Sequence, residues 1–348
     1  MGLGLLGVCL VLLVGLGGLW TWALLPGPGA GQVVQVHWSA AAPTSSAGER
    51  LAEHGLIASP RLFELYLRLV RPSVEPAAGA HLLNDRLSPR ELVQRLARLP
   101  SRPTVKVAVP EGFNHVQLGE RLEKLEVCSK SAFLDAVHSR ALLAELSIRG
   151  SSAEGLLFPA TYELGVNSAA SSVVRTMVKT FRARLAKLSE RYPQQRLELT
   201  RTRGWSEHEI ATLASIVEKE AAHADERPTI ASVYYNRLDD PDFRPKRMLQ
   251  ADPTAAYGCL IRGSEIPSCT GFDGKVTPAM LRDPENPYNT YRHAGLPPGP
   301  IANAGAGALE AVLSPTRTDY LFFVATGQGR HTFSRTLEEH NRAIDKRR

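Results

Sequence analysis

The sequence predicts an α+β protein with three parts: an N-terminal transmembrane helix, a small α/β module and a larger mixed α+β domain. Three observations predict this class. The first 25 residues include no charged side chain. Short Val-rich runs with alternating polarity then occur among segments whose leucines repeat at helical spacing. A length of 348 residues usually corresponds to more than one folded unit.

Residues 1–25 are expected to anchor the chain in a membrane. At about 1.5 Å per residue, an apolar helix of this length can cross a hydrocarbon core of roughly 30 Å. Trp20 and Trp22 lie near one end, where indole rings favour the interface. A cleaved signal peptide is the alternative, but the charged start and the small-residue cleavage site that it needs are not evident. No Lys or Arg precedes Arg50, so charge does not indicate the orientation.

Residues 26–31 (PGPGAG) are expected to form a linker, and residues 32–100 a small α/β module. Ser88 is the predicted N-cap of the module's last helix, with Pro89 in its first turn. The other predicted elements are a strand at 32–38 and helices at 48–56 and 60–70.

A faint internal repeat links this module to the start of the domain at 101–348. After a strand-like run at 104–109, residues 119–122 repeat the GERL of residues 48–51. The order strand, helix, helix therefore recurs. Such a unit is typical of a small polymer-binding module, and two ordinary α+β segments that resemble each other by chance explain the pattern equally well.

The larger domain should be helical at first and rich in loops after Arg247, where prolines become frequent. Ser206 and Glu209 have the spacing of a capping box at the start of one helix. The predicted helices are 169–185, 206–222 and 227–238, and a strand is predicted at 320–325.

Composition and charge limit the class of function. A net charge of +6 suits binding to an acidic polymer such as cell wall or nucleic acid. The sequence has no basic stripe interleaved with aromatic residues, so nucleic acid is the weaker interpretation. The four cysteines lack zinc-ligand spacing, and no His or Cys cluster suggests a metal or a cofactor. Cys259 and Cys269 flank a short loop, where a disulfide and two free thiols are equally compatible with the sequence.

Glu220 is the strongest candidate for acid–base chemistry. On a helical wheel, Glu220 projects from within a broad apolar arc, whereas Glu218 lies at its far edge. A carboxyl in apolar surroundings has a raised pKa, which a general acid near neutral pH requires. A buried structural glutamate is the alternative, and the helix pattern taken alone favours that alternative.

Further motifs occur in one order along the chain. They are FPATY at 158–162, ASIVEKEA at 214–221, SVYYNRL at 232–238, LQADPT at 249–254, NPYNTY at 286–291, GLPPGPIAN at 295–303 and HTF at 331–333. In these motifs the chain resembles the MltG (YceG-like) family of endolytic murein transglycosylases. The resemblance covers nearly everything beyond the expected anchor at residues 1–25.

The resemblance implies a single-pass inner-membrane protein whose catalytic domain lies on the periplasmic or outer side. It also implies that residues 32–100 are LysM-like, and that peptidoglycan synthases are partners. The activity implied is non-hydrolytic cleavage between MurNAc and GlcNAc, which trims or terminates nascent glycan strands. Alignment of the Glu220–Ala221 and Asn236–Arg237 pairs with those of related spore-cortex enzymes selects Glu220 as the catalytic residue, with Glu218 second.

One strong carboxylate candidate fits a lytic transglycosylase, because the C6 hydroxyl of MurNAc supplies the nucleophile that most glycosidases take from water or a second carboxylate. Tyrosine rings can stack on sugars while amides and carboxylates bind hydroxyl and acetamido groups. The candidate substrate-binding residues are Asn236, Gln250, Asp252, Tyr288, Asn289 and Tyr291.

The sequence is compatible with two alternative functions. A hydrolase of the same bond would need a second carboxylate, which Asp252 or Glu218 could supply. A membrane-tethered peptidoglycan-binding scaffold without catalysis would suit the anchor, the module and the positive charge, but it gives the intact motif around Glu220 no role.

Overall fold

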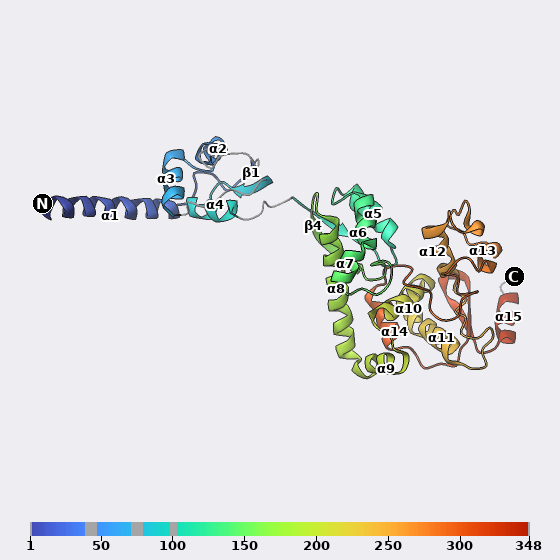
Figure 1. Cartoon of the computed structure of the whole chain (residues 1–348). Helices are drawn as coiled ribbons and strands as arrows, with labels where there is room; N and C mark the ends of the chain where they lie inside the picture. Colours follow the sequence, from blue (N-terminus) through green and yellow to red (C-terminus); the bar gives the residue numbers. More distant parts are fainter. Residues whose placement is uncertain (1, 39–46, 71–78, 98–102, 347–348) are drawn as a thin grey trace. The chain divides into compact units, whose positions relative to one another are not determined.

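A computed structural model describes residues 2–38, 47–70, 79–97 and 103–346 (Figure 1). The chain divides into two compact units, Met1–Pro103 and Thr104–Arg348. Each unit combines helices with small antiparallel sheets of two strands, so the predicted α+β class is confirmed.

The first unit contains one antiparallel pair, in which Val36 of β1 lies opposite His81 of β2. Val36, Trp38 and Leu83 are buried, as alternating residues of a half-buried sheet should be. The elements of this unit are α1 (Gly2–Leu24), β1 (Val33–Trp38), α2 (Ala47–Glu53), α3 (Pro60–Val70), β2 (Gly79–Asn84) and α4 (Pro89–Leu96).

The last turns of α1 belong to the core of this first unit. Leu19 and Ala23 are buried in one cluster with side chains of α3 and α4. The guanidinium of Arg90 lies 5.6 Å from the ring centroid of Trp20. No helix among the described residues has the combination of length and hydropathy that a membrane span requires.

The predicted linker at 26–31 is tied to the rest of its unit. The carboxylate of Asp85 accepts hydrogen bonds from the backbone N–H groups of Ala30 at 3.2 Å and Gly31 at 2.7 Å. A Cβ added to Gly29 would lie 1.9 Å from Cγ of Asp85, so only glycine allows this approach. The segment is thus a fixed connection, because a side chain distant in the sequence satisfies its backbone.

The second unit contains two strand pairs, β3–β4 near its start and β5–β6 near its end. Val107 of β3 lies opposite Tyr162 of β4, and both are buried. The elements of this unit are β3 (Thr104–Ala108), α5 (His115–Lys124), α6 (Lys130–His138), α7 (Arg140–Glu145), β4 (Thr161–Gly165), α8 (Ala170–Arg191), α9 (Pro193–Arg203), α10 (Glu207–Glu220), η2 (Ala224–Glu226), α11 (Arg227–Asp239), α12 (Asp252–Arg262), η3 (Pro267–Cys269), α13 (Pro278–Arg282), α14 (Ala306–Leu313), β5 (Phe322–Ala325), η4 (Gly327–Gly329), β6 (His331–Ser334) and α15 (Leu337–Asp345).

The repeat of strand, helix and helix is confirmed in the structure. The order β1, α2, α3, β2 recurs as β3, α5, α6, β4, with α7 added before the last strand. The two GERL glycines make matching contacts: a Cβ on Gly48 would lie 2.6 Å from the carbonyl oxygen of Pro60, and one on Gly119 3.2 Å from Cγ of Lys130. Pro60 and Lys130 each begin the next helix, so both glycines allow the two helices to pack closely.

The region after Arg247 contains more helix than its prolines predicted, because α12, α13 and α14 lie there. Pro253 and Pro278 occupy the first turns of α12 and α13, where proline costs no hydrogen bond and its backbone angle suits a helix. These prolines start helices, whereas the sequence pattern predicts loops.

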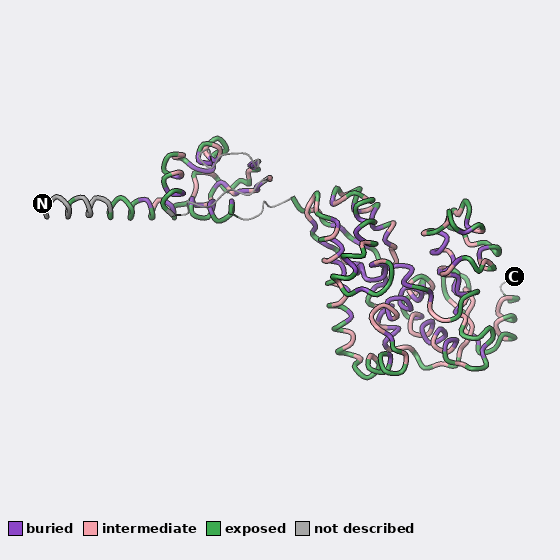
Figure 2. Tube along the Cα trace, viewed as in Figure 1, coloured by how far each residue is buried: buried purple, intermediate pink, exposed green. Residues whose placement is uncertain are grey.

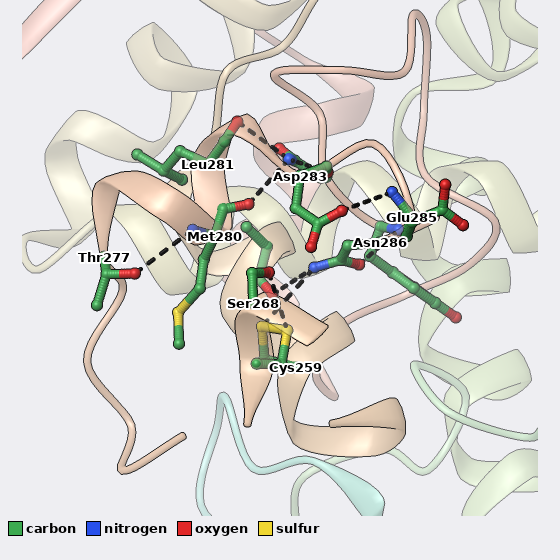
Figure 3. Close-up of a disulfide and its surroundings, with 12 residues drawn as sticks. Cys259, Ser268, Thr277, Met280, Leu281, Asp283, Glu285 and Asn286 are labelled. Carbon is green, nitrogen blue, oxygen red and sulfur yellow. Dashed lines mark hydrogen bonds between the residues drawn. A yellow bond between two sulfur atoms is a disulfide. The ribbon is translucent and has the colours of Figure 1, made fainter. Parts of the chain in front are cut away.

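A disulfide joins Cys259 of α12 to Cys269 of η3 (Figure 3), which decides between the two alternatives that the sequence left open. The two cysteines form a small separate core with Ile266 and Met280. The side-chain amide of Asn286 lies beside the disulfide and donates to the carbonyl oxygen of Ala255 at 2.9 Å. This segment is therefore braced independently of the main core.

Candidate active site

Helix α10 is the central helix of the second unit. The carboxylate of Glu209 accepts the backbone N–H of Ser206 at 2.7 Å, so the predicted capping box is present. Every residue from Ile210 to Val217 is buried, because α11, α12 and α14 all pack against the helix (Figure 2). The helix is thus buried on all sides between these residues, whereas the sequence predicted one broad apolar arc, and polar groups reach solvent only near its ends.

Glu220 is the last residue of α10 and is partly buried. The hydroxyl of Tyr234, on α11, donates to its Oε1 at 3.1 Å. Burial raises the pKa of Glu220 to about 7; the charge of Asp252 also raises it, while Tyr234 and the charge of Arg237 lower it. A carboxyl group that is half protonated near neutral pH can donate a proton and later accept one.

Glu220 opens into a cavity of about 390 Å³. The cavity lies between the end of α10, the start of α12, the β5–β6 hairpin and α15. Its lining residues are Glu220, Arg237, Gln250, Asp252, Tyr291, Phe322, Phe323, Val324, Ala325, His331, Leu337 and His340.

Three predicted substrate-binding residues lie in this cavity with Glu220: Gln250, Asp252 and Tyr291. The hydroxyl of Tyr291 donates to Oδ1 of Asp252 at 2.6 Å. Gln250 adopts a left-handed backbone conformation with φ of 53°, and its N–H donates to the carbonyl oxygen of Thr290 at 3.1 Å. A non-glycine residue in this conformation is held there by its surroundings, and such positions cluster at functional sites.

The other three predicted substrate-binding residues do not line this cavity. The amide of Asn236 donates to the backbone carbonyls of Thr318 and Tyr320 at 2.9 and 2.8 Å. Asn289 is fully buried and its amide donates to three backbone carbonyls. The ring of Tyr288 packs against that of Tyr257, with 5.0 Å between centroids. These contacts brace loops, so the amides are occupied by the protein itself.

Glu218, the second candidate acid, is also absent from the cavity lining. Its Oε1 accepts from Arg227 at 2.8 Å and its Oε2 from the backbone N–H of Gly305 at 3.1 Å. Burial raises the pKa of Glu218, although the charge of Arg227 opposes the shift. Both carboxylate oxygens have protein partners, so Glu218 joins α10 to α11 and α14.

Several lining residues were not predicted as site residues, and most of them belong to the end of the chain. Arg237 is buried among the rings of Phe243, Phe322 and Phe323, 5.5 to 5.9 Å from their centroids. His331 and His340 come from β6 and α15. Arg237 and His331 stood within recognised motifs, but nothing in the spacing of those motifs placed their side chains beside Glu220.

The described residues include no group of three or more His, Cys, Asp or Glu side chains that could hold a metal ion. The side chains that line the cavity offer a protonatable carboxyl, a second carboxylate, one guanidinium and two imidazoles.

Comparison with known families matches residues 36–346 to the sequence model of the YceG-like family. The chain belongs to the YceG-like family. The match begins at residue 36 within the first unit of this YceG-like protein, continues to residue 346 of the second and includes every residue of the cavity.

Similar proteins are known from several bacteria. The endolytic murein transglycosylase of Bacillus subtilis is 28% identical over 331 residues, which cover 90% of this chain and 84% of the relative. That of Streptococcus pneumoniae D39 is 27% identical over 85% of this chain, which spans only 55% of the longer relative. The crystal structure of a yceG-like protein from Listeria monocytogenes matches 90% of this chain with a TM-score of 0.57 and 31% identity.

Proposed function

We propose that this YceG-like protein is an endolytic murein transglycosylase. It cleaves the bond between MurNAc and GlcNAc within peptidoglycan strands and leaves 1,6-anhydroMurNAc ends. The observation that carries this proposal is Glu220, whose carboxyl has a pKa raised to about 7 and opens into a cavity lined by hydrogen-bonding and aromatic side chains. The names of the relatives from B. subtilis and S. pneumoniae support the same activity.

The reaction needs one carboxyl that changes role. Protonated Glu220 donates its proton to the glycosidic oxygen as the bond from C1 of MurNAc to that oxygen breaks. The C6 hydroxyl oxygen of the same MurNAc bonds to C1, and its proton passes to the Glu220 carboxylate. Water is not consumed, and Glu220 ends protonated. The nearby negative charge of Asp252 would stabilise the positive charge that develops at C1 in the transition state.

The experiment that tests this function is mass spectrometry of purified glycan strands after incubation with the protein. Internal fragments ending in 1,6-anhydroMurNAc are expected. Products that are heavier by one water would instead identify a hydrolase of the same bond, with Asp252 as the second carboxylate in the cavity. Strands that bind without being cleaved at any pH would identify the non-catalytic scaffold.

The rate of cleavage should fall as pH rises through about 7, because Glu220 must be protonated to act. In the wild type, the hydroxyl of Tyr234 stabilises the ionised carboxylate and so lowers the pKa of Glu220. Tyr234→Phe should therefore raise this pKa and move the alkaline limb of the profile to higher pH. A pH–rate profile measures the shift. Tyr235→Phe is the matched control, as its hydroxyl donates to the carbonyl oxygen of Val312 outside the cavity. An unmoved limb in Tyr234→Phe would contradict the role of that hydrogen bond.

We further propose that residues 1–25 anchor the protein in the inner membrane, with the catalytic unit on the periplasmic or outer side. The support is the uncharged sequence of this segment and the disulfide, since disulfides persist in oxidising compartments. Fractionation of cells that express the full chain should recover it in membranes, and its second unit should be accessible to protease added outside the inner membrane. Recovery in the soluble fraction would contradict the anchor.

Residues 32–100 are proposed to be a LysM-like module that binds glycan, and peptidoglycan synthases are proposed partners. The order β1, α2, α3, β2 supports the first proposal. Sedimentation with purified peptidoglycan, with and without residues 32–100, tests it. A pull-down from membranes that recovers no synthase would count against the second.

A further inference from the structure

The imidazole of His331 lines the Glu220 cavity, and the reaction described above gives it no role. His331 begins β6 and lies opposite Ala325 of β5, which also lines the cavity. Its side chain is only 7% exposed. The ring of Phe323 packs against the imidazole at 89°, with 5.2 Å between centroids. The position and plane of the imidazole are therefore fixed.

Glu226 determines which nitrogen of this imidazole faces other partners. Its Oε1 accepts the backbone N–H of His331 at 3.1 Å, and its Oε2 lies 2.8 Å from Nδ1. Because an ionised carboxylate can only accept hydrogen bonds, Nδ1 carries the hydrogen. Within the described part of the chain, no protein group is hydrogen-bonded to Nε2 of His331.

The turn after Glu220 holds the hairpin that carries His331. His223 Nε2 lies 2.9 Å from the carbonyl oxygen of Gln328, at the hairpin tip. The guanidinium of Arg330 donates to Asp225 at 2.7 Å. With the Glu226–His331 pair, three neighbouring contacts thus connect residues 223–226 to the β5–β6 hairpin. Glu220 and His331 are joined by this short braced path, which fixes the distance between the two side chains.

We propose that His331, oriented by Glu226, is a substrate-binding residue whose Nε2 forms a hydrogen bond with a sugar hydroxyl of the glycan strand in the Glu220 cavity. The proposal rests on the glycan-cleaving function argued above. Hydroxyl groups both donate and accept hydrogen bonds, so they suit the acceptor Nε2 of a neutral imidazole and the donor Nε2 of a charged one. This hydrogen bond affects how tightly the glycan strand binds and where the strand lies in the cavity.

Two substitutions separate binding by Nε2 from the contact with Glu226. His331→Asn keeps an amide that can reach Glu226 in place of Nδ1 but has no group at the position of Nε2. In His331→Gln, the terminal amide of the longer side chain can reach the position that Nε2 occupies in the wild type. In steady-state assays on glycan strands, His331→Asn should raise KM about three- to tenfold, the effect of one lost hydrogen bond. His331→Gln should restore part of the affinity, whereas a purely structural histidine would tolerate Asn as well as Gln.

Arg330→Ala is the matched control. It removes another contact of the same hairpin with residue 225, but Arg330 does not line the cavity, so its KM should stay near that of the wild type. A wild-type KM for His331→Asn would overturn the proposal, as would an equal increase for Arg330→Ala. Should His331→Asn be unstable, Glu226→Gln gives a second test, because it removes the carboxylate that orients the imidazole.

Strand binding to Glu220→Gln protein, with and without His331→Asn, separates this proposal from the proposed function. A lower affinity in the double variant supports the role of His331 even if cleavage is never observed. Equal affinities overturn it even if the wild type makes anhydro products.

Discussion

Glu220→Gln is expected to abolish cleavage of glycan strands, with a fall in kcat of at least about a thousandfold. A glutamine keeps the size and polarity of the side chain, and it can accept the hydrogen bond that Tyr234 donates at 3.1 Å. It cannot donate a proton to the glycosidic oxygen or take one from the C6 hydroxyl. The folded structure should therefore persist while both proton transfers are lost. The measurement is the yield of 1,6-anhydroMurNAc ends over time.

Glu218→Gln is the control for this experiment, since Glu218 lies two residues away on the same helix and does not line the cavity. Its loss weakens a buried contact with Arg227 and should lower stability more than it lowers kcat. Thermal unfolding of both variants distinguishes a chemical defect from a folding defect. If Glu218→Gln is inactive but folded while Glu220→Gln still cleaves, the roles of the two glutamates are reversed.

Glu154→Ala should have the largest effect on stability, lowering the free energy of unfolding by about 3–5 kcal/mol. Glu154 is 1% exposed. Its carboxylate accepts from the backbone N–H of His115 at 3.0 Å, the hydroxyl of Tyr257 at 3.1 Å and the amide of Asn303 at 2.7 Å, and its Oε2 lies 2.5 Å from Nδ1 of His115. Alanine would leave these buried groups without partners.

Urea denaturation measures this loss, and Glu145→Ala is the control. Glu145 pairs with Arg175 on the exposed surface, where ion pairs contribute little, so no measurable change is expected. Because Tyr257 belongs to α12, whose first residue Asp252 lines the cavity, Glu154→Ala should also reduce cleavage. A Glu154→Ala variant as stable as the wild type would contradict this prediction. It would show that the space left by the carboxylate collapses or admits water with no loss of stability.

Local sequence patterns determined several helix caps and secondary-structure elements of this protein. The caps at Ser88 and Ser206, helix α3 and the strands β1, β3 and β5 follow from hydrogen bonding and side-chain periodicity within a few residues. The choice of Glu220 over Glu218 also came from the sequence. Its raised pKa was predicted because a carboxyl among apolar neighbours on a helix is costly to ionise, whichever groups complete the cavity.

Only the tertiary structure decided which polar side chains face the cavity. Asn236 and Asn289 have the chemistry to bind sugars, yet their amides satisfy backbone carbonyls of nearby loops. Asp252 and Tyr291 have similar chemistry and lie beside Glu220. His331 reaches the same cavity from the end of the chain. A buried hydrogen-bonding side chain pairs with the polar groups that lie beside it in the folded protein. Segments distant in the sequence supply those groups, so local sequence patterns do not identify them.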